Sequence, residues 1–204
     1  DNIDIKILLI YLLHDDLIEA TDSIYLLKSS TGSGKTRCAP FLFAIKALNS
    51  NLKQPFFLMT QPSTSIIKDK IEDFNNILGD SVVLIGNDYN QFRQYYFNVT
   101  KRKYSENKPI IALFTPHNMA KLISNNKNIF KYARFVLDEI HERSVETDVI
   151  TALVANELKN TRIPLQLLMM TATPDIRIQN LFKEPKVKPI DLPDSLLFRI
   201  DDIP

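Results

Sequence analysis

Short, continuous apolar runs that alternate with helical patterns constrain the fold of this chain more than any other feature. They predict strands at residues 23–30, 55–62, 81–86, 109–116, 133–140 and 164–174, with a candidate last strand at 186–193. Runs that are apolar on both faces are typical of parallel strands covered by helices on each side. We therefore predict an α/β fold, a mostly parallel sheet with helices on both faces.

Helical patterns fill most of the intervals between these runs. Apolar positions at helical spacing predict helices at residues 1–20, 35–50, 63–78, 117–125, 145–159 and 175–183. In the third of these, Ser63 or Ser65 would be the cap and Gly79 would end the helix. The stretch 87–108 is polar and aromatic without a clear period, so we expect a hairpin or a surface loop there.

Length and composition narrow the possibilities further. The 204 residues suit one large domain, and we predict a single domain over residues 1–204. A net charge of +1 does not indicate a general basic surface for nucleic acid. Cys38 is the one cysteine, which fits a reducing compartment. No run approaches the roughly 18 apolar residues that cross a bilayer, so we expect an intracellular protein of the cytoplasm or nucleus, with no membrane association.

The stretch SSTGSGKT, from Ser29 to Thr36, follows the first apolar run and precedes a predicted helix. It matches the pattern G-x-x-x-x-G-K-[ST], except that Ser29 stands at the first glycine position. Backbone amides in such a turn, with the positive end of the helix, can surround a polyphosphate. Lys35 would reach the terminal phosphates, and the Thr36 hydroxyl would ligate Mg²⁺. The residues expected to bind the nucleotide are Ser30, Thr31, Gly32, Ser33, Gly34, Lys35, Thr36 and Arg37.

The run ARFVL is followed directly by the acidic stretch DEIHERS. At the carboxyl end of a parallel strand, Asp138 and Glu139 would lie beside the phosphate-binding turn. Asp138 can hold Mg²⁺, and Glu139 can orient and deprotonate an attacking water. His141 would point the same way as Glu139 if the chain stays extended. The alternative is a charged turn at a helix start, since Glu142 and Glu146 suit a first helical turn.

Five segments resemble, in order, the motifs of superfamily 2 helicases, and most closely those of the DEAH-box (DExH) RNA helicases. TGSGKT resembles their motif I, LMTQPSTSI resembles motif Ia, and FTPHNMAKLI resembles motif Ib. LDEIHERSVETDVITALV resembles motif II, and MMTATPD resembles motif III. Together the segments span Ser29 to Asp175, which is most of the chain.

This resemblance implies the first RecA-like domain of a P-loop NTPase that uses ATP or another NTP with Mg²⁺. The catalytic set would be Lys35, Asp138, Glu139 and His141, with Thr36 and Asp138 as the Mg²⁺ ligands. His141 would connect the nucleotide site to motif III, where Thr171, Ala172 and Thr173 would relay the nucleotide state. The residues expected to contact single-stranded RNA or DNA are Gln61, Pro62, Ser63, Thr64, Thr115, Pro116 and His117.

The chain departs from the family pattern at the segments expected to contact nucleic acid. Ser63 and Thr64 replace the paired arginines of motif Ia, so we expect a weaker salt dependence of binding. His117 and Asn118 stand in motif Ib where a glycine is common. His117 could touch the nucleic-acid backbone, or it could be a polar helix cap.

The chain begins at Asp1 without a methionine and ends at Pro204, and we expect a fragment of a longer protein. A second RecA-like domain of the same protein would close the nucleotide site. We therefore expect the isolated fragment to be a monomer that binds nucleotide weakly and hydrolyses it poorly or not at all. The departures in motif Ia, with many Asn, Ile and Lys residues, suggest a diverged lineage such as a large DNA virus, whose virion would be a further location.

Two other functions are weighed against the helicase interpretation. A nucleotide or metabolite kinase would explain TGSGKT, but not DEIHERS followed by TATP at a later strand end. A nucleotide-gated scaffold without catalysis is the non-enzymatic alternative. The joint presence of Lys35, Thr36, Asp138 and Glu139 argues against a degenerate site.

Overall fold

The computed structural model describes residues 23–28, 36, 54–142, 144–160, 166–173, 182 and 187–191. Within them, a seven-stranded sheet has the order β3-β4-β2-β5-β6-β1-β7, and each described pairing is parallel. The strands are β1 (Ser23–Lys28), β2 (Phe56–Thr60), β3 (Val83–Gly86), β4 (Ile110–Phe114), β5 (Ala133–Leu137), β6 (Gln166–Thr171) and β7 (Val187–Asp191). The helices are α4 (Thr64–Leu78), α5 (Tyr89–Thr100), α6 (Pro116–Asn125) and α7 (Val145–Asn160), with 3-10 turns η1 (Gly79–Ser81), η2 (Lys127–Lys131) and η3 (Ile140–Glu142).

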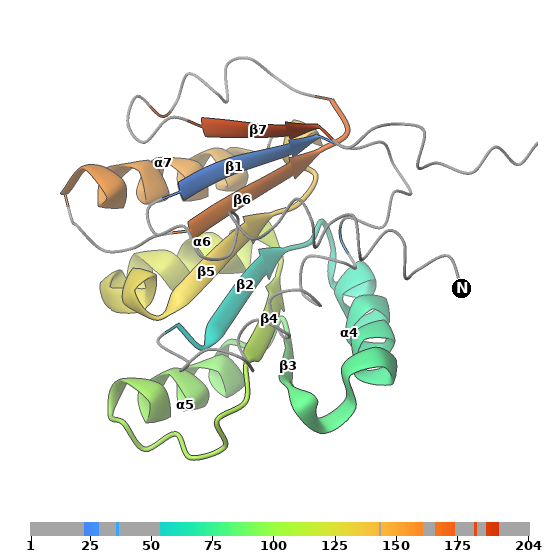
Figure 1. Ribbon diagram of the computed structural model, residues 1–204, viewed down its shortest axis with the longest axis vertical. Helices are drawn as coiled ribbons and strands as arrows, with labels where there is room; N and C mark the ends of the chain where they lie inside the picture. The colour runs from blue at the N-terminus through green and yellow to red at the C-terminus, as the bar shows by residue number, and fades with distance from the viewer. Residues whose placement is uncertain are drawn as a thin grey trace, which may run out of the picture.

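Successive side chains of each strand point to opposite faces of the sheet. Both faces are buried because helices pack on each of them. In β2, Phe56 and Leu58 belong to the core that includes side chains of α5, α6 and α7. Phe57 and Met59 belong to the core that includes side chains of α4. Figure 1 shows α4 on one side of the sheet and α5, α6 and α7 on the opposite side. The expected α/β fold with helices on both faces is confirmed.

Local chemistry fixes both ends of helix α4. The Ser63 hydroxyl accepts a hydrogen bond from the Ile66 amide (3.4 Å), as short polar side chains do at helix starts. Gly79 follows the last helical residue with a φ of 49°, which glycine adopts without a steric penalty. The predicted helix with its end at Gly79 is therefore confirmed, and of the two candidate caps, Ser63 and Ser65, it is Ser63 that caps the helix.

Helix α5 lies where we expected a hairpin or a surface loop, so that prediction is wrong for residues 89–100, whereas residues 101–108 form an irregular connection as a loop would. Asp88 caps the helix by accepting a hydrogen bond from the Gln91 amide (2.9 Å). Phe92 is 1% exposed, and its ring centroid lies 5.0 Å from that of Phe56. The helical period is hard to detect in the sequence because several positions that pack on the core are tyrosines, which read as polar.

The carboxyl ends of the paired strands lie along one edge of the sheet, because the pairings are parallel. Strand β5 lies between β2 and β6, and β1 lies on the far side of β6. Residues that follow β5 are therefore close to the ends of β2 and β6, and β1 ends one strand further along the same edge. This edge is where the acidic stretch and the phosphate-binding turn were expected to meet.

Several predictions fall on residues that the structure does not describe. They include the helix at residues 1–20 and, apart from the helical Thr36 and the buried Phe182, the helices at residues 35–50 and 175–183. The candidate last strand is confirmed as β7, which lies at the sheet edge beside β1. Across the described ranges, none of the helices is both long and apolar enough to cross a membrane.

Candidate functional site

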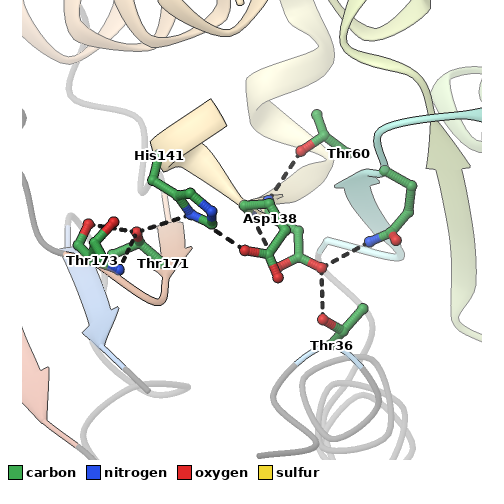
Figure 2. Close-up of polar contacts among 8 residues, drawn as sticks. Thr36, Thr60, Asp138, His141, Thr171 and Thr173 are labelled. Carbon is green, nitrogen blue, oxygen red and sulfur yellow. Dashed lines mark hydrogen bonds and ion pairs between the residues drawn. The ribbon is translucent and has the colours of Figure 1, made fainter. Parts of the chain in front are cut away.

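Asp138 follows β5 directly and lies at the centre of a network of polar contacts (Figure 2). Its carboxylate Oδ2 accepts a hydrogen bond from the Thr36 hydroxyl at 2.7 Å. The two residues are 102 positions apart in the sequence. The fold therefore brings Thr36, from the stretch SSTGSGKT, against the aspartate that follows β5, which is the proximity that the sequence predicted.

Strand β2 holds Asp138 from the other side. The Asp138 amide donates to the Thr60 hydroxyl (3.0 Å), and the Gln61 side-chain Nε2 donates to Asp138 Oδ2 (3.0 Å). Thr60 and Gln61 are 1% and 2% exposed, so water cannot readily replace these partners. A buried carboxylate that accepts several hydrogen bonds has a fixed orientation, which a metal ligand requires.

The donor atoms at this site fit a magnesium ion. Thr36 supplies a hydroxyl oxygen and Asp138 a carboxylate oxygen, and Mg²⁺ prefers oxygen ligands. Among the described residues, no group of three or more His, Cys, Asp and Glu side chains is placed to hold a metal. Mg²⁺ commonly takes one or two protein oxygens, as Thr36 and Asp138 offer, with nucleotide phosphates and water completing its coordination.

Glu139 has a left-handed backbone conformation, with a φ of 50°. Its amide donates to Asp138 Oδ1 (3.0 Å), and its carbonyl oxygen accepts from the Glu142 amide (3.0 Å). Positive φ is unfavourable for a residue with a side chain, and such strain is concentrated at functional sites. The chain turns here into η3, so our premise that it stays extended from Glu139 to His141 is wrong.

His141 nevertheless lies beside both Glu139 and motif III. Its Nδ1 is 3.3 Å from Glu139 Oε2 and 3.3 Å from the Thr171 hydroxyl. The Thr171 hydroxyl donates to the Thr173 carbonyl oxygen (2.7 Å), so its single proton is already engaged. This arrangement favours the tautomer with hydrogen on Nδ1, which then donates to its two neighbours.

The expected contact between His141 and the stretch TAT is present. Thr171 is fully buried, and it also accepts a hydrogen bond from the Thr173 amide (3.1 Å). Ala172 lies between these two threonines in the bend that follows β6. The relay role that we assigned to Thr171, Ala172 and Thr173 stays a prediction, because it concerns a change between two states.

Gln61 does not lie where we expected it. We placed it among the residues that contact nucleic acid, but its side chain is buried and bonded to Asp138. The next residues do reach the surface: Pro62 and Thr64 are exposed, and Ser63 is half-buried because it caps α4. The physical reason is that the side chain of the first residue after a strand can still point inward, as that of Gln61 does toward Asp138.

The second expected nucleic-acid segment forms the start of α6. The Thr115 hydroxyl accepts from the Asn118 amide (3.4 Å) and caps the helix, with Pro116 in its first turn. His117 is therefore not the cap; it is exposed, and its Nδ1 lies 3.9 Å from Glu146 Oε1 on α7.

The remaining predicted site residues fall outside the described part of the chain. They are Ser30, Thr31, Gly32, Ser33, Gly34, Lys35 and Arg37. Of the stretch expected to bind the nucleotide, Thr36 is the described residue, and its hydroxyl contacts Asp138 at the end of β5.

The acidic stretch is also followed directly by helix α7, in line with our alternative interpretation of a charged turn at a helix start. Glu146 lies in the first turn of α7, and the Ser144 hydroxyl accepts from the Thr147 amide (3.0 Å). The two interpretations are compatible, because Asp138 and Glu139 precede the helix and belong to the site.

Two further residues organise the site although we did not select them from the sequence. Thr60 accepts from the Asp138 amide, and Asn87 accepts from both the Thr115 amide (3.2 Å) and Asn118 Nδ2 (2.9 Å). Asn87 has a φ of 56°, a conformation that asparagine tolerates better than most residues. Each is a polar residue at or just after the end of an apolar strand, and that position was the available signal.

Comparison with known proteins agrees with this geometry. The family model "DEAD/DEAH box helicase" matches residues 11–181. The chain belongs to the DEAD/DEAH box helicase family. The resemblance to DEAH-box helicases inferred from the five motifs is thereby confirmed.

Individual relatives are more distant. The zebrafish (Danio rerio) ATP-dependent RNA helicase TDRD9 is 29% identical over 165 residues, which cover 77% of this chain and 11% of that protein. The Drosophila melanogaster ATP-dependent RNA helicase DHX33 is 27% identical over 168 residues, covering 78% of this chain and 22% of that protein. The chain thus spans only 11% to 22% of the length of these relatives.

Solved structures support the fold. The Escherichia coli DEAH/RHA helicase HrpB has a TM-score of 0.62 at 20% identity, covering 89% of this chain and 22% of the other. The Pyrococcus furiosus Hef helicase domain has a TM-score of 0.57 at 18% identity, covering 83% of this chain and 36% of the other. The predicted RecA-like fold is confirmed.

Proposed function

We propose that this chain is the ATP-binding motor domain of an ATP-dependent RNA helicase, which couples nucleotide hydrolysis to movement along nucleic acid or to its unwinding. The 2.7 Å contact between the Thr36 hydroxyl and the Asp138 carboxylate carries this proposal. It joins Thr36, the end of the predicted phosphate-binding stretch, to an acidic strand end, and neither would serve hydrolysis alone. Family membership and the names of the relatives agree with it.

The residues at this edge divide the chemistry among them. Bound Mg²⁺ would neutralise charge on the phosphates and align them for attack. Thr36 and Asp138 would hold the ion, and Lys35 would pair with the terminal phosphates. Glu139 would accept the proton of the attacking water, while His141, whose Nδ1 lies 3.3 Å from its Oε2, would orient the carboxylate.

The nucleic-acid surface in this proposal consists of the exposed starts of α4 and α6. Pro62, Thr64 and His117 are exposed there, and helix amides and hydroxyls can bond phosphate oxygens. We propose RNA as the substrate because the relatives' names specify it. A second RecA-like domain would complete both the nucleotide site and the nucleic-acid channel.

Nucleotide hydrolysis by the full-length protein tests this function. We expect single-stranded RNA to stimulate ATP turnover and Lys35→Ala to abolish it. A matched control is Lys131→Ala, an exposed lysine that precedes β5 at the opposite edge of the sheet, which should leave turnover unchanged. A scaffold would show no turnover in the wild type, and a kinase would need a small phosphate acceptor instead of RNA.

The isolated chain gives an independent check. If a second domain completes the site, this chain alone should hydrolyse ATP poorly, with or without RNA. Robust RNA-stimulated turnover by the isolated chain would show that it contains a complete motor, contrary to the proposal.

A further inference from the structure

Gln61 links the ends of β2, β4 and β5 through one backbone bond and one side-chain bond. Its amide donates to the carbonyl oxygen of Phe114, the last residue of β4, at 2.9 Å. Its side-chain Nε2 donates to Asp138 Oδ2, just after β5, at 3.0 Å. The residue is 2% exposed, so both bonds are shielded from water and are correspondingly directional.

The segments adjoining these bonds lead to the surface that we propose for nucleic acid. Pro62 and Ser63 follow Gln61, and Ser63 caps α4. Thr115 follows Phe114 and caps α6. The ring of Pro62 fixes its backbone φ, which leaves little freedom between Gln61 and the first turn of α4.

We infer that Gln61 is a positioning residue that couples the orientation of the Asp138 carboxylate to the starts of α4 and α6. The inference rests on the proposed function, because it takes Asp138 as the metal carboxylate and the two helix starts as the nucleic-acid surface. It differs from the contact of His141 with Thr171, which leads to β6 and does not involve β2.

The physical basis is that two hydrogen-bond donors share one oxygen atom of the Asp138 carboxylate. Asp138 Oδ2 accepts from both Thr36 and Gln61, so a rotation of the carboxylate changes the two bonds together. The Gln61 side chain must then follow or release its partner. Because the Gln61 backbone is held by Phe114, a movement is passed to Pro62 or to the end of β4. Direct contact of Gln61 with nucleic acid is incompatible with its burial.

The test measures how strongly nucleotide changes RNA affinity in the full-length protein. Fluorescence anisotropy of a labelled single-stranded RNA gives the dissociation constant without nucleotide and with Mg²⁺ plus a non-hydrolysable ATP analogue. The variant Gln61→Met has a similar length but no donor. The variant Gln61→Asn keeps an amide, but its side chain is one methylene shorter. It is used in place of Gln61→Met if that variant does not fold. Gln94→Met, at an exposed position of α5, is the matched control.

We expect the wild-type ratio of the two constants to differ from one by about fivefold or more, as is usual for coupled sites. Gln61→Met should bring this ratio close to one, leave the nucleotide-free RNA affinity within about twofold, and preserve cooperative unfolding. Gln94→Met should behave as the wild type. If Gln61→Met keeps the wild-type ratio, whether or not both affinities fall, Gln61 does not couple the two sites. The proposed function is then unaffected. A wild-type ratio of one overturns the inference together with nucleotide-coupled RNA binding, and an absence of RNA binding overturns the proposed function as well.

Hydrogen exchange of the wild-type protein gives a second readout that needs no variant. Adding Mg²⁺ and the analogue should change amide exchange in the first turns of α4 and α6, while α5 stays constant. Unchanged exchange in both first turns contradicts the inference.

Discussion

Glu139 combines a left-handed backbone with a side chain that faces His141 and an amide bonded to the neighbouring Asp138. Such a conformation persists only where several contacts determine it, and here the Glu142 amide and Asp138 Oδ1 hold its backbone on either side. The strained turn places one carboxylate in the buried network and the next beside the histidine. Adjacent acidic residues can thus take separate roles.

Replacing Glu139 by glutamine tests the role of the base. We expect Glu139→Gln to lower ATP turnover by about 10²-fold or more, because an amide cannot accept the proton. Nucleotide affinity should stay near that of the wild type, since the amide keeps the shape and the Asp138 site is intact. Glu142→Gln, an exposed residue of the same turn, is the control and should be active. Full activity of Glu139→Gln would assign the base elsewhere.

For single residues, the sequence predicted the chemical role of a side chain better than the direction in which the side chain points. Asp138 and Thr36 were correctly expected to meet, because parallel strand ends share one edge of a sheet and both residues follow buried strands. The burial of Gln61 could not be predicted, since a glutamine after a strand can point outward or inward. Its direction depends on Asp138, which is 77 residues away in the sequence.

The elements around the site were predictable to different degrees. Helix α4 was predictable because its cap and its terminal glycine are local signals. Helix α5 was not, because Tyr95 and Tyr96 pack on the core with rings that read as polar in the sequence. Packing against the sheet, and not propensity alone, stabilises such a helix.

The end of α4 allows a clean measurement of backbone strain. A Cβ at Gly79 would meet nothing within 4 Å, so Gly79→Ala should affect only the backbone at its φ of 49°. We expect the free energy of unfolding to fall by about 1 kcal/mol. Asn76→Ala, at an exposed position of the same helix, should be neutral or slightly stabilising. Denaturant unfolding measures both, and equal stability of Gly79→Ala and the wild type would contradict the strain.

The connection between α5 and β4 contains a tyrosine that responds to alkaline pH. Burial, and secondly the charge of Glu106, raise the pKa of Tyr104 from 10.0 to about 12. The Tyr104 hydroxyl also donates to the Lys108 carbonyl oxygen (2.8 Å). Because the pKa is raised in the folded state, the associated stability is complete below pH 10 and is lost as the pH rises towards about 12.

The variant Tyr104→Phe isolates this contribution. Near neutral pH, we expect it to lower the free energy of unfolding by roughly 1 kcal/mol, the usual value of one hydrogen bond. It should also reduce the loss of stability between pH 10 and 12. An ultraviolet titration of the wild type minus the variant measures the pKa directly, and a difference curve centred at the ordinary value of 10.0 would refute the shift.

At the scale of the whole molecule, the net charge of +1 predicts that nucleic-acid binding relies on few ion pairs. Lys68 is exposed one turn into α4, beside the proposed surface, where motif Ia has no arginines. We expect Lys68→Ala to reduce the slope of log affinity against log salt by about 1. Lys131→Ala, at the opposite edge, should leave the slope unchanged. Equal slopes for the wild type and Lys68→Ala would remove Lys68 from the surface.

A double-mutant cycle measures most directly whether the predicted phosphate-binding turn and the acidic strand end act on one magnesium–nucleotide complex. Mg²⁺-dependent ATP affinity is determined for the wild type, Thr36→Val, Asp138→Asn and the double variant. A shared ion predicts that the second substitution costs much less than the first, with a coupling free energy of about 1 kcal/mol or more. Additive losses would mean that Thr36 and Asp138, though 2.7 Å apart here, do not hold a common ion, and would contradict the proposed motor site.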